Sequence, residues 1–209
     1  TESEYKNLVR TAQNSQAILI GDIIPGHTGK GADFRLAEMA YQDYPGLYTM
    51  VEIETKDWSL LPKVPSNQDS VNLSSEQVDV LTQKGYLPGH LQRVLFSVPG
   101  KTGLTGWDAT KEVMGPDNKY RRWVYLHYFK PGQPTLNWLD PSFAAQRLIS
   151  GDIIKTKTVL GASIIRLDAN PFLGIEPQAG TTNARSESTY LSLEASNMIA
   201  QMMRDRKSG

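Results

Sequence analysis

The sequence predicts an α/β fold in which a parallel sheet is interrupted by a long inserted subdomain. Two short apolar runs, residues 17–24 and 162–170, have the length and β-branched content of strands buried on both faces. Each run follows a segment with apolar residues at helical spacing, as in a parallel α/β unit. Residues 28–134 show no such alternation, so we expect one domain from 1–27 and 135–209 and a second from 28–134.

The amino-terminal unit has the pattern of a helix, a tight turn and a strand. Apolar residues recur at helical spacing early in the chain, at Tyr5, Leu8, Val9 and Ala12. The strand AILIGDII follows, and Pro25 and Gly26 close it. This strand delivers Asp22 to its carboxyl end, with His27 five residues further on.

The inserted segment is rich in Gly, Pro, Asn and Asp, with tyrosines and tryptophans scattered through it. We expect a short helix within 71–85, with Ser75 as its N-cap. Residues 94–98 and 123–129 have the composition of strands, which we expect to pair around the turn at 116–118. A structureless loop of this length is improbable in a compact domain, so the segment predicts a loop-rich α+β subdomain.

The α/β pattern resumes near Asp140. This residue and the proline after it predict a helix start with Asp140 as the N-cap, and Gly161 predicts the end of that helix. The run ASIIRLDAN then forms the second strand, whose last residues include the charged Arg166 and Asp168. A final helix is expected at 189–206.

The composition excludes several classes of function. Lys and Arg number 22 and Asp and Glu number 22, so the zero net charge offers no attraction for nucleic acid or an anionic membrane. There is no cysteine, which excludes disulfides, thiol nucleophiles and thiolate metal sites and is typical of a cytoplasmic protein. No apolar run approaches the ~20 residues that span a bilayer. The oligomeric state is left open.

Charged side chains come at the end of both predicted strands. The carboxyl ends of parallel strands are where α/β folds build their sites, so the candidate site residues are Asp22, His27, Arg166 and Asp168. Arg166 and Asp168 are two residues apart and point to the same face of a strand. An arginine beside a carboxylate keeps it ionised and aimed, as a nucleophile requires. The residue types alone favour a structural Arg–Asp pair that caps a strand end over a catalytic pair.

The order of the motifs resembles glycoside hydrolase family 13, the α-amylase superfamily. The motifs are DIIPGH at the first strand end, then a long segment, then QPTLNW, and finally IIRLDAN at the second strand end. In that family the first motif closes the third strand of a barrel, the insertion is domain B, and the last motif closes the fourth strand. The resemblance covers almost the whole chain and implies part of a TIM (β/α)8 barrel with an inserted domain B.

The resemblance also implies a role for each candidate residue. Asp168 is expected to be the catalytic nucleophile and Arg166 its catalytic partner, while Asp22 and His27 bind substrate. Longer stretches are most similar to the trehalose synthases, which implies a retaining enzyme that interconverts maltose and trehalose through a covalent glucosyl–aspartate intermediate. Other family 13 enzymes (α-glucosidases, sucrose isomerases, amylases) and a non-catalytic sugar-binding relative remain alternatives.

Three positions depart from the family pattern. Gly26 stands where the family has an Asn that often binds calcium, which argues against a structural calcium ion here. Phe172 replaces a His that is common four residues after the nucleophile, and Thr135 replaces the Asp of the family's QPD segment. The chemistry itself requires no cofactor.

The family's general acid, a Glu, and a second Asp follow later strands of the barrel. A retaining glycosidase needs two carboxyl groups, one on each side of the scissile bond. We therefore expect this chain to be an internal fragment that supplies one of them and is inactive by itself.

Overall fold

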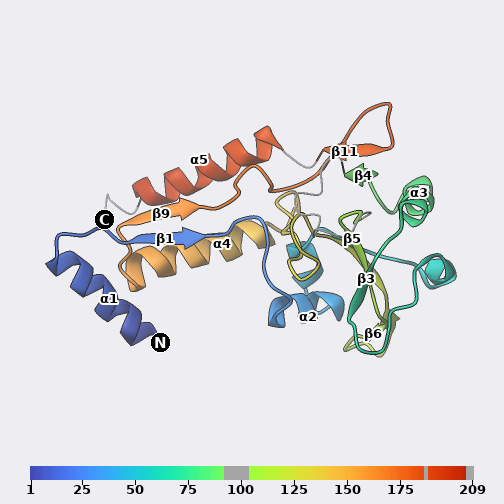
Figure 1. The fold of residues 1–209 in the computed structure, drawn as a ribbon, viewed down its shortest axis with the longest axis horizontal. Coiled ribbons are helices and arrows are strands. Elements are labelled where there is room, and N and C mark those ends of the chain that lie inside the picture. The colour runs from blue at the N-terminus through green and yellow to red at the C-terminus, as the bar shows by residue number, and fades with distance from the viewer. Residues whose placement is uncertain (92–103, 186–187, 206–209) are drawn as a thin grey trace.

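The computed structural model describes residues 1–91, 104–185 and 188–205. It has two parts (Figure 1): a pair of parallel strands with its helices, and a lobe built on an antiparallel sheet. The strand pair comes from both ends of the chain, and the lobe comes mainly from the segment between them.

The strand pair consists of β1 (Ile20–Ile23) and β9 (Ile164–Leu167). The two strands are adjacent and parallel, which confirms the prediction for these two apolar runs. Their register places Asp22 directly opposite Arg166. Residues that lie far apart in the sequence are thus neighbours across one ladder.

Helices cover one face of the strand pair. α4 (Ala144–Ile154) and α5 (Thr189–Asp205) run alongside it (Figure 1) and share its core. η3 (Lys155–Val159), a π-helical turn, continues α4, and Gly161 with a φ of +84° follows in the left-handed region that favours glycine. α1 (Glu2–Asn14) lies beyond the amino-terminal end of β1. The core combines strand and helix residues: Ile23, Ile149, Ile153, Leu191, Ala195 and Ile199.

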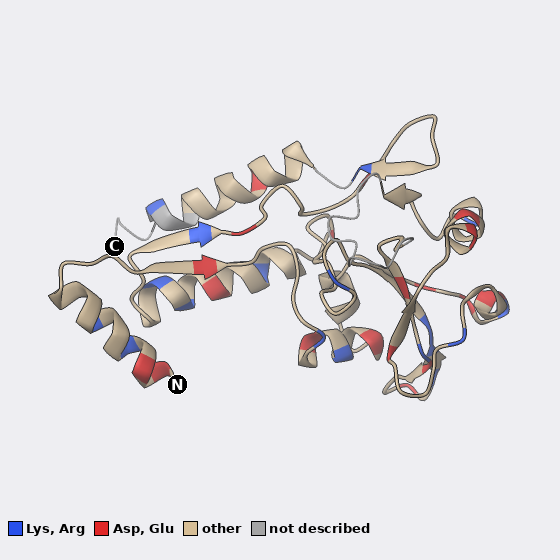
Figure 2. Cartoon of the chain, viewed as in Figure 1, with Lys and Arg blue, Asp and Glu red and all other residues tan. Residues whose placement is uncertain are grey.

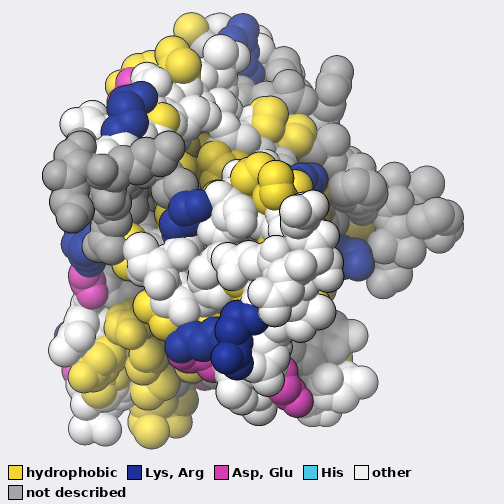
Figure 3. Space-filling view, turned by 90° about the vertical axis from the view of Figure 1, so that its left-hand side faces the viewer, with side chains coloured by type: hydrophobic (Ala, Val, Ile, Leu, Met, Phe, Trp, Pro, Cys, Tyr) yellow, Lys and Arg dark blue, Asp and Glu magenta, His cyan; other side chains and the backbone are white. Residues whose placement is uncertain are grey.

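The other face of the strand pair is open. Ile20 is 56% exposed and Ile164 is 47% exposed, so the expectation that both faces are buried is wrong. The described residues place helices on one face only, and side chains alternate between faces along a strand. Asp22 and Arg166 therefore share the open face with two isoleucines. Figure 3 looks at the end of the molecule that carries α1 and shows hydrophobic side chains at that surface.

The lobe is built on a four-stranded antiparallel sheet. Its strands run in the order β2 (Met50–Glu52), β8 (Trp123–Leu126), β5 (Trp107–Thr110) and β3 (Ser70–Asn72). All side chains of β5 and β8 are buried, because these central strands are covered on both faces. The lobe has its own core, which includes Ile53, Leu73, Leu81, Trp107, Leu126 and Tyr128.

Short elements complete the lobe and join it to the strand pair. They are α2 (Ala32–Glu38), η1 (Tyr44–Leu47), η2 (Thr55–Leu60), α3 (Ser75–Gln83), and the hairpin of β6 (Val113–Met114) and β7 (Tyr120–Arg121). A further small sheet contains β10 (Glu176–Pro177), β11 (Asn183–Arg185) and β4 (His90–Leu91). Because β11 pairs with β4, the segment after β9 is tied to the lobe.

Two lobe predictions need correction. The N-cap of α3 is Ser74, not Ser75, because the Ser74 hydroxyl accepts from the backbone N–H of Gln77 while the Gln77 side chain accepts from Ser74. The strand predicted at 123–129 ends at Leu126 and pairs with β2 and β5. The turn near 116–118 joins β6 to β7, and residues 94–98 lie outside the described residues.

The predicted start of α4 is also wrong. Asp140 is not its N-cap, since the helix begins at Ala144 after Phe143, whose φ is +56°. The Asp140 carboxylate accepts from the backbone N–H of Ser142 at 2.8 Å, and its carbonyl accepts from the N–H of Phe143. Asp140 therefore forms a tight turn ahead of the helix, as Asp side chains often do.

Candidate functional site

Arg166 links two carboxylates at the carboxyl ends of the parallel strands. Its Nη1 donates to Asp22 Oδ2 at 2.7 Å, and its Nη2 donates to Asp168 Oδ1 at 2.6 Å. Figure 2 shows this positive charge on β9 beside the negative charge on β1. The structure thus brings together three of the four candidate residues through one guanidinium.

The strand ladder explains this arrangement. Asp22 and Arg166 are register partners, so their side chains stand on the same face. The ladder continues past β9, because the N–H of Asp168 donates to the carbonyl of Ile23 at 2.9 Å. Asp168 therefore keeps the strand alternation and returns to the face that carries Arg166.

The three charged side chains are exposed. Arg166 is 56% exposed, Asp22 54% and Asp168 37%. The hydrogen bond to Asp168, followed by the charges of both carboxylates, raises the pKa of Arg166 above its usual value. Oδ2 of Asp168 accepts no hydrogen bond from the described residues. One oxygen is therefore held by the arginine, and the other has no hydrogen-bond donor among the described residues.

His27 approaches the same site from the loop after β1. Its backbone pairs with Thr135, and its ring lies 5.2 Å from the ring of Phe129. Burial lowers the pKa of His27 below 6.5, and the nearby charge of Asp168 partly offsets this by raising it. The charge of Asp168 therefore acts on the His27 ring. In the described structure no hydrogen bond joins His27 to the three charged residues.

The segment QPTLNW returns the chain to the end of β1. The carbonyl of Gly26 accepts from the N–H of Leu136 at 2.9 Å, and the carbonyl of Pro25 accepts from the indole N–H of Trp138 at 2.8 Å. Thr135 is fully buried, and no described group bonds to its hydroxyl. The segment therefore ends the lobe next to His27. Its backbone contacts with Gly26 and His27 hold the histidine at the end of β1.

Gly26 stands where the family pattern has a possible calcium ligand, and it packs closely against the loop after β9. Gly26 offers no side-chain ligand, and a Cβ added there would lie 3.0 Å from the carbonyl oxygen of Phe172, which is tighter than ordinary contact. Within the described residues, no three His, Asp or Glu side chains are grouped as metal ligands. The loop after β9 occupies the space that a larger residue at position 26 would need.

Sequence reasoning overlooked a buried polar network in the lobe. His127 and Asp108 are both buried, and the ring Nε2 lies 2.9 Å from Asp108 Oδ1. Asn72 donates to the same carboxylate, and Ser70 lies within hydrogen-bond distance of Asp108 and of Tyr125. No motif surrounds His127 in the sequence, so the sequence offered no signal for this network.

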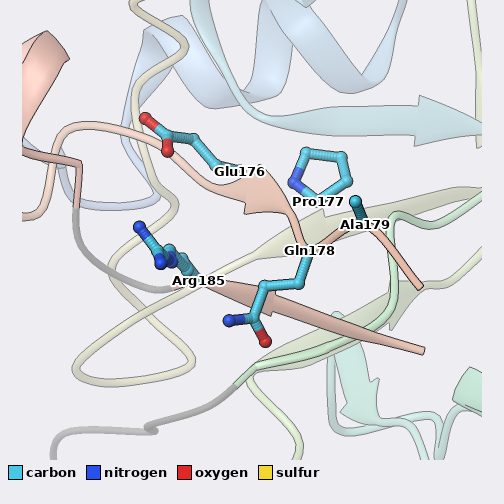
Figure 4. Close-up of a pocket in the computed structure, with 5 residues that line it drawn as sticks. All are labelled: Glu176, Pro177, Gln178, Ala179 and Arg185. Carbon is cyan, nitrogen blue, oxygen red and sulfur yellow. The ribbon is translucent and has the colours of Figure 1, made fainter. Parts of the chain in front are cut away.

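A polar hollow lies on the β10–β11 hairpin, away from the charged residues at the strand ends. It has a volume of about 280 Å³ and is lined by Glu176, Pro177, Gln178, Ala179 and Arg185. Figure 4 shows the Glu176 and Arg185 side chains on one side of the hairpin. Glu176 accepts a hydrogen bond from the hydroxyl of Ser188. The hollow is shallow and belongs to a different element from Asp22 and Asp168.

The fold is similar to part of several solved enzymes. A Family GH13_31 enzyme matches with a TM-score of 0.58 and 15% identity, over 97% of this chain and 32% of that one. A mutant isomaltulose synthase from Erwinia rhapontici, solved with its natural substrate sucrose, matches with a TM-score of 0.56 and 16% identity, over 100% and 30%. Trehalose-6-phosphate hydrolase from Bacillus licheniformis gives 0.52 and 14%, over 97% and 29%.

The chain spans about a third of the length of these enzymes. At such low identity the likeness shows a shared fold: the chain has the α/β architecture of one segment of these enzymes. No protein-family model and no curated protein matches the chain. Among the described residues, no helix is both long and apolar enough to cross a membrane.

Proposed function

We propose that this chain is the nucleophile-bearing segment of a retaining α-glucosyl enzyme of glycoside hydrolase family 13. The observation that carries the proposal is the bridge from Arg166 to Asp22 and Asp168 at the carboxyl ends of two parallel strands. A structural ion pair does not need both carboxylates on an open face. A nucleophile needs one oxygen held and one free, as Asp168 has.

In this proposal Oδ2 of Asp168 attacks the anomeric carbon of an α-glucoside. A bond forms between that oxygen and the carbon, the glycosidic bond breaks, and the leaving oxygen takes a proton from a general acid. Arg166 holds and aims Asp168 through its hydrogen bond, while Asp22 and His27 contact hydroxyl groups of the glucose. The general acid is a second carboxyl group, which we expect from another part of a longer protein about 5–5.5 Å away.

We further propose that the enzyme interconverts maltose and trehalose. The support is the likeness of the segments on both sides of the lobe to trehalose synthases and the place of the lobe directly after His27. A lid in that place excludes water from the glucosyl intermediate, so a retained glucose is rejoined to it. Sucrose isomerisation is the second candidate, since one similar structure is an isomaltulose synthase solved with sucrose.

The test gives the full-length protein maltose, trehalose and sucrose in separate reactions and follows the products over time. We expect trehalose to exceed free glucose from the earliest points with maltose, and added labelled glucose to enter trehalose poorly. Glucose as the dominant product would make the enzyme a hydrolase. Sucrose as the preferred substrate favours a sucrose isomerase, and binding without turnover favours a non-catalytic relative. The proposal requires no cofactor, so prior treatment with a chelator leaves the rates unchanged.

A further inference from the structure

We propose that Asn170 and Ser192 form a latch between the loop after β9 and helix α5, and that this latch positions the carboxylate of Asp168. Both residues are positioning residues, since neither touches the reacting atoms. The inference rests on the proposed function of Asp168 as a nucleophile. It concerns residues to which the motif resemblance assigns no role.

The chain turns sharply directly after Asp168. Ala169 has a φ of +49°, in the left-handed region that non-glycine residues rarely adopt. The carbonyl of Ala169 accepts from the N–H of Phe172 at 3.0 Å, which closes a tight turn. Such conformations persist where the surroundings hold them, and they concentrate at functional sites.

The side chain of Asn170 anchors this turn to α5. Its Nδ2 donates to the carbonyl of Ser192 at 3.2 Å and lies 3.0 Å from Oγ of Ser196. The hydroxyl of Ser192 reaches back to the carbonyl of Asn170 at 2.9 Å, and it also lies 2.7 Å from the carbonyl of Ser188. The contact is reciprocal: each of Asn170 and Ser192 donates from its side chain to the backbone of the other.

The Asn170 side chain also has an unfavourable feature, a buried oxygen atom without a hydrogen-bond partner in the described structure. Its Oδ1 is buried and has no hydrogen-bond partner among the described residues. A buried polar atom without a partner is unfavourable. An apolar side chain at position 170 avoids that cost, so we infer that the two donated hydrogen bonds to α5 are the reason for an asparagine here.

The latch acts on a carboxylate that has few other restraints. Upstream, the backbone of Asp168 is fixed by the hydrogen bond from its N–H to Ile23. Among the residues that the structure describes, Arg166 is the one donor to the Asp168 carboxylate. Downstream, Asn170 ties the turn at Ala169 to α5, and a backbone hydrogen bond from Ser188 to Pro171 is the next restraint along the loop. A misplacement of about 1 Å in a catalytic group costs about a hundredfold in rate. Loss of the latch should therefore slow the attack by Asp168.

The experiment uses the full-length protein and the variants Asn170→Ala and Ser192→Ala. The matched control is Asn183→Ala, because Asn183 is exposed and its side chain makes no hydrogen bond in the described structure. An activated, fluorinated α-glucosyl donor is the probe, since it traps the glucosyl intermediate. The rate of labelling of the peptide that contains Asp168 is followed by mass spectrometry, beside kcat and KM for maltose and the thermal unfolding midpoint.

We expect the wild type to label Asp168, and both variants to label it about tenfold to a hundredfold more slowly with KM changed less than about threefold. The double variant should be less than additive, because the two residues act as one unit. Labelling at the wild-type rate in folded variants, with only a lower unfolding midpoint, overturns the latch and leaves the proposed function intact. If Asn170→Ala does not fold, Ser192→Ala decides alone. A wild type that is never labelled at Asp168 overturns the proposed function itself.

Discussion

The guanidinium of Arg166 lies between the carboxylates of Asp22 and Asp168, at 2.7 Å from one and 2.6 Å from the other. One positive charge thus forms ion pairs with two negative charges on an exposed face. Exposed ion pairs contribute little to stability. The arrangement therefore favours a functional role for the bridge, in which the arginine aims Asp168 through one N–H group and is itself aimed by Asp22 through another.

In the proposed mechanism, Asp168→Asn in the full-length protein should abolish turnover, because an amide is no nucleophile, and should leave the unfolding midpoint almost unchanged. Arg166→Lys should lower kcat by about tenfold or more, since a single ammonium group does not reproduce the fork that spans two carboxylates. Initial rates with maltose measure both effects. Arg147→Lys is the control, because Arg147 forms an exposed pair with Asp43 away from this site. Near-normal turnover in Asp168→Asn would contradict the proposed mechanism.

The imidazole of His27 should titrate below pH 6.5, since burial lowers its pKa more than Asp168 raises it. The neutral form of its ring is therefore favoured more than in a free imidazole. Asp168→Asn removes the charge that raises the pKa, so the pKa of His27 should fall further in that variant. Histidine proton NMR over a pH series measures both values.

This shift also has a consequence for stability. The folded pKa of His27 is depressed below its unfolded value, so the unfolded chain binds more protons as pH falls. The contribution of His27 is present above about pH 6.5 and is lost as pH falls through the folded pKa. Denaturant midpoints of wild type and His27→Gln should therefore converge toward acid pH. A gap that widens toward acid pH would contradict this sign.

Asp108→Asn should lower the free energy of unfolding by about 3–5 kcal/mol, because it strips one partner from a buried pair. Burial raises the pKa of Asp108, but the hydrogen bond and charge of His127 and the hydrogen bonds from Asn72 and Ser70 together lower it below 3.8. Its contribution is therefore present above about pH 3.8 and is lost as pH falls through the lower folded value. Urea unfolding measures the difference, with the exposed Glu112→Gln as the control.

Three Gly→Ala variants separate steric clash from backbone strain. A Cβ on Gly89 would lie 2.2 Å from the carbonyl oxygen of Thr182, and its φ is +133°. Gly85 has a φ of +81° with no atom within 4 Å, and Gly29 has neither problem. Gly85→Ala should cost about 1–2 kcal/mol, Gly89→Ala more, and Gly29→Ala almost nothing. If Gly85→Ala and Gly89→Ala lower the free energy of unfolding equally in chemical denaturation, the contact between position 89 and Thr182 adds no steric cost.

Much of the architecture was predictable because it depends on local pattern. The apolar runs around Ile20 and Ile164 are strands, as their composition predicts, and they lie side by side in parallel. Element ends were less predictable. Ser74 rather than Ser75 caps α3 because of a reciprocal bond with Gln77, and Asp140 makes a turn ahead of α4 instead of starting it. Adjacent polar residues offer equivalent caps, and only backbone geometry chooses between them.

The sequence by itself determined which residue types meet at the two strand ends, since alternation along a strand puts Arg166 and Asp168 on one face. Only the tertiary structure decided that Asp22 is the register partner of Arg166, 144 residues away in the chain, and that Asn170 is held by α5. It also decided that His127 and Asp108 are buried together. The physical reason is that hydrogen bonds and burial between distant segments depend on how the whole chain packs, and periodicity within one segment carries no information about its partner.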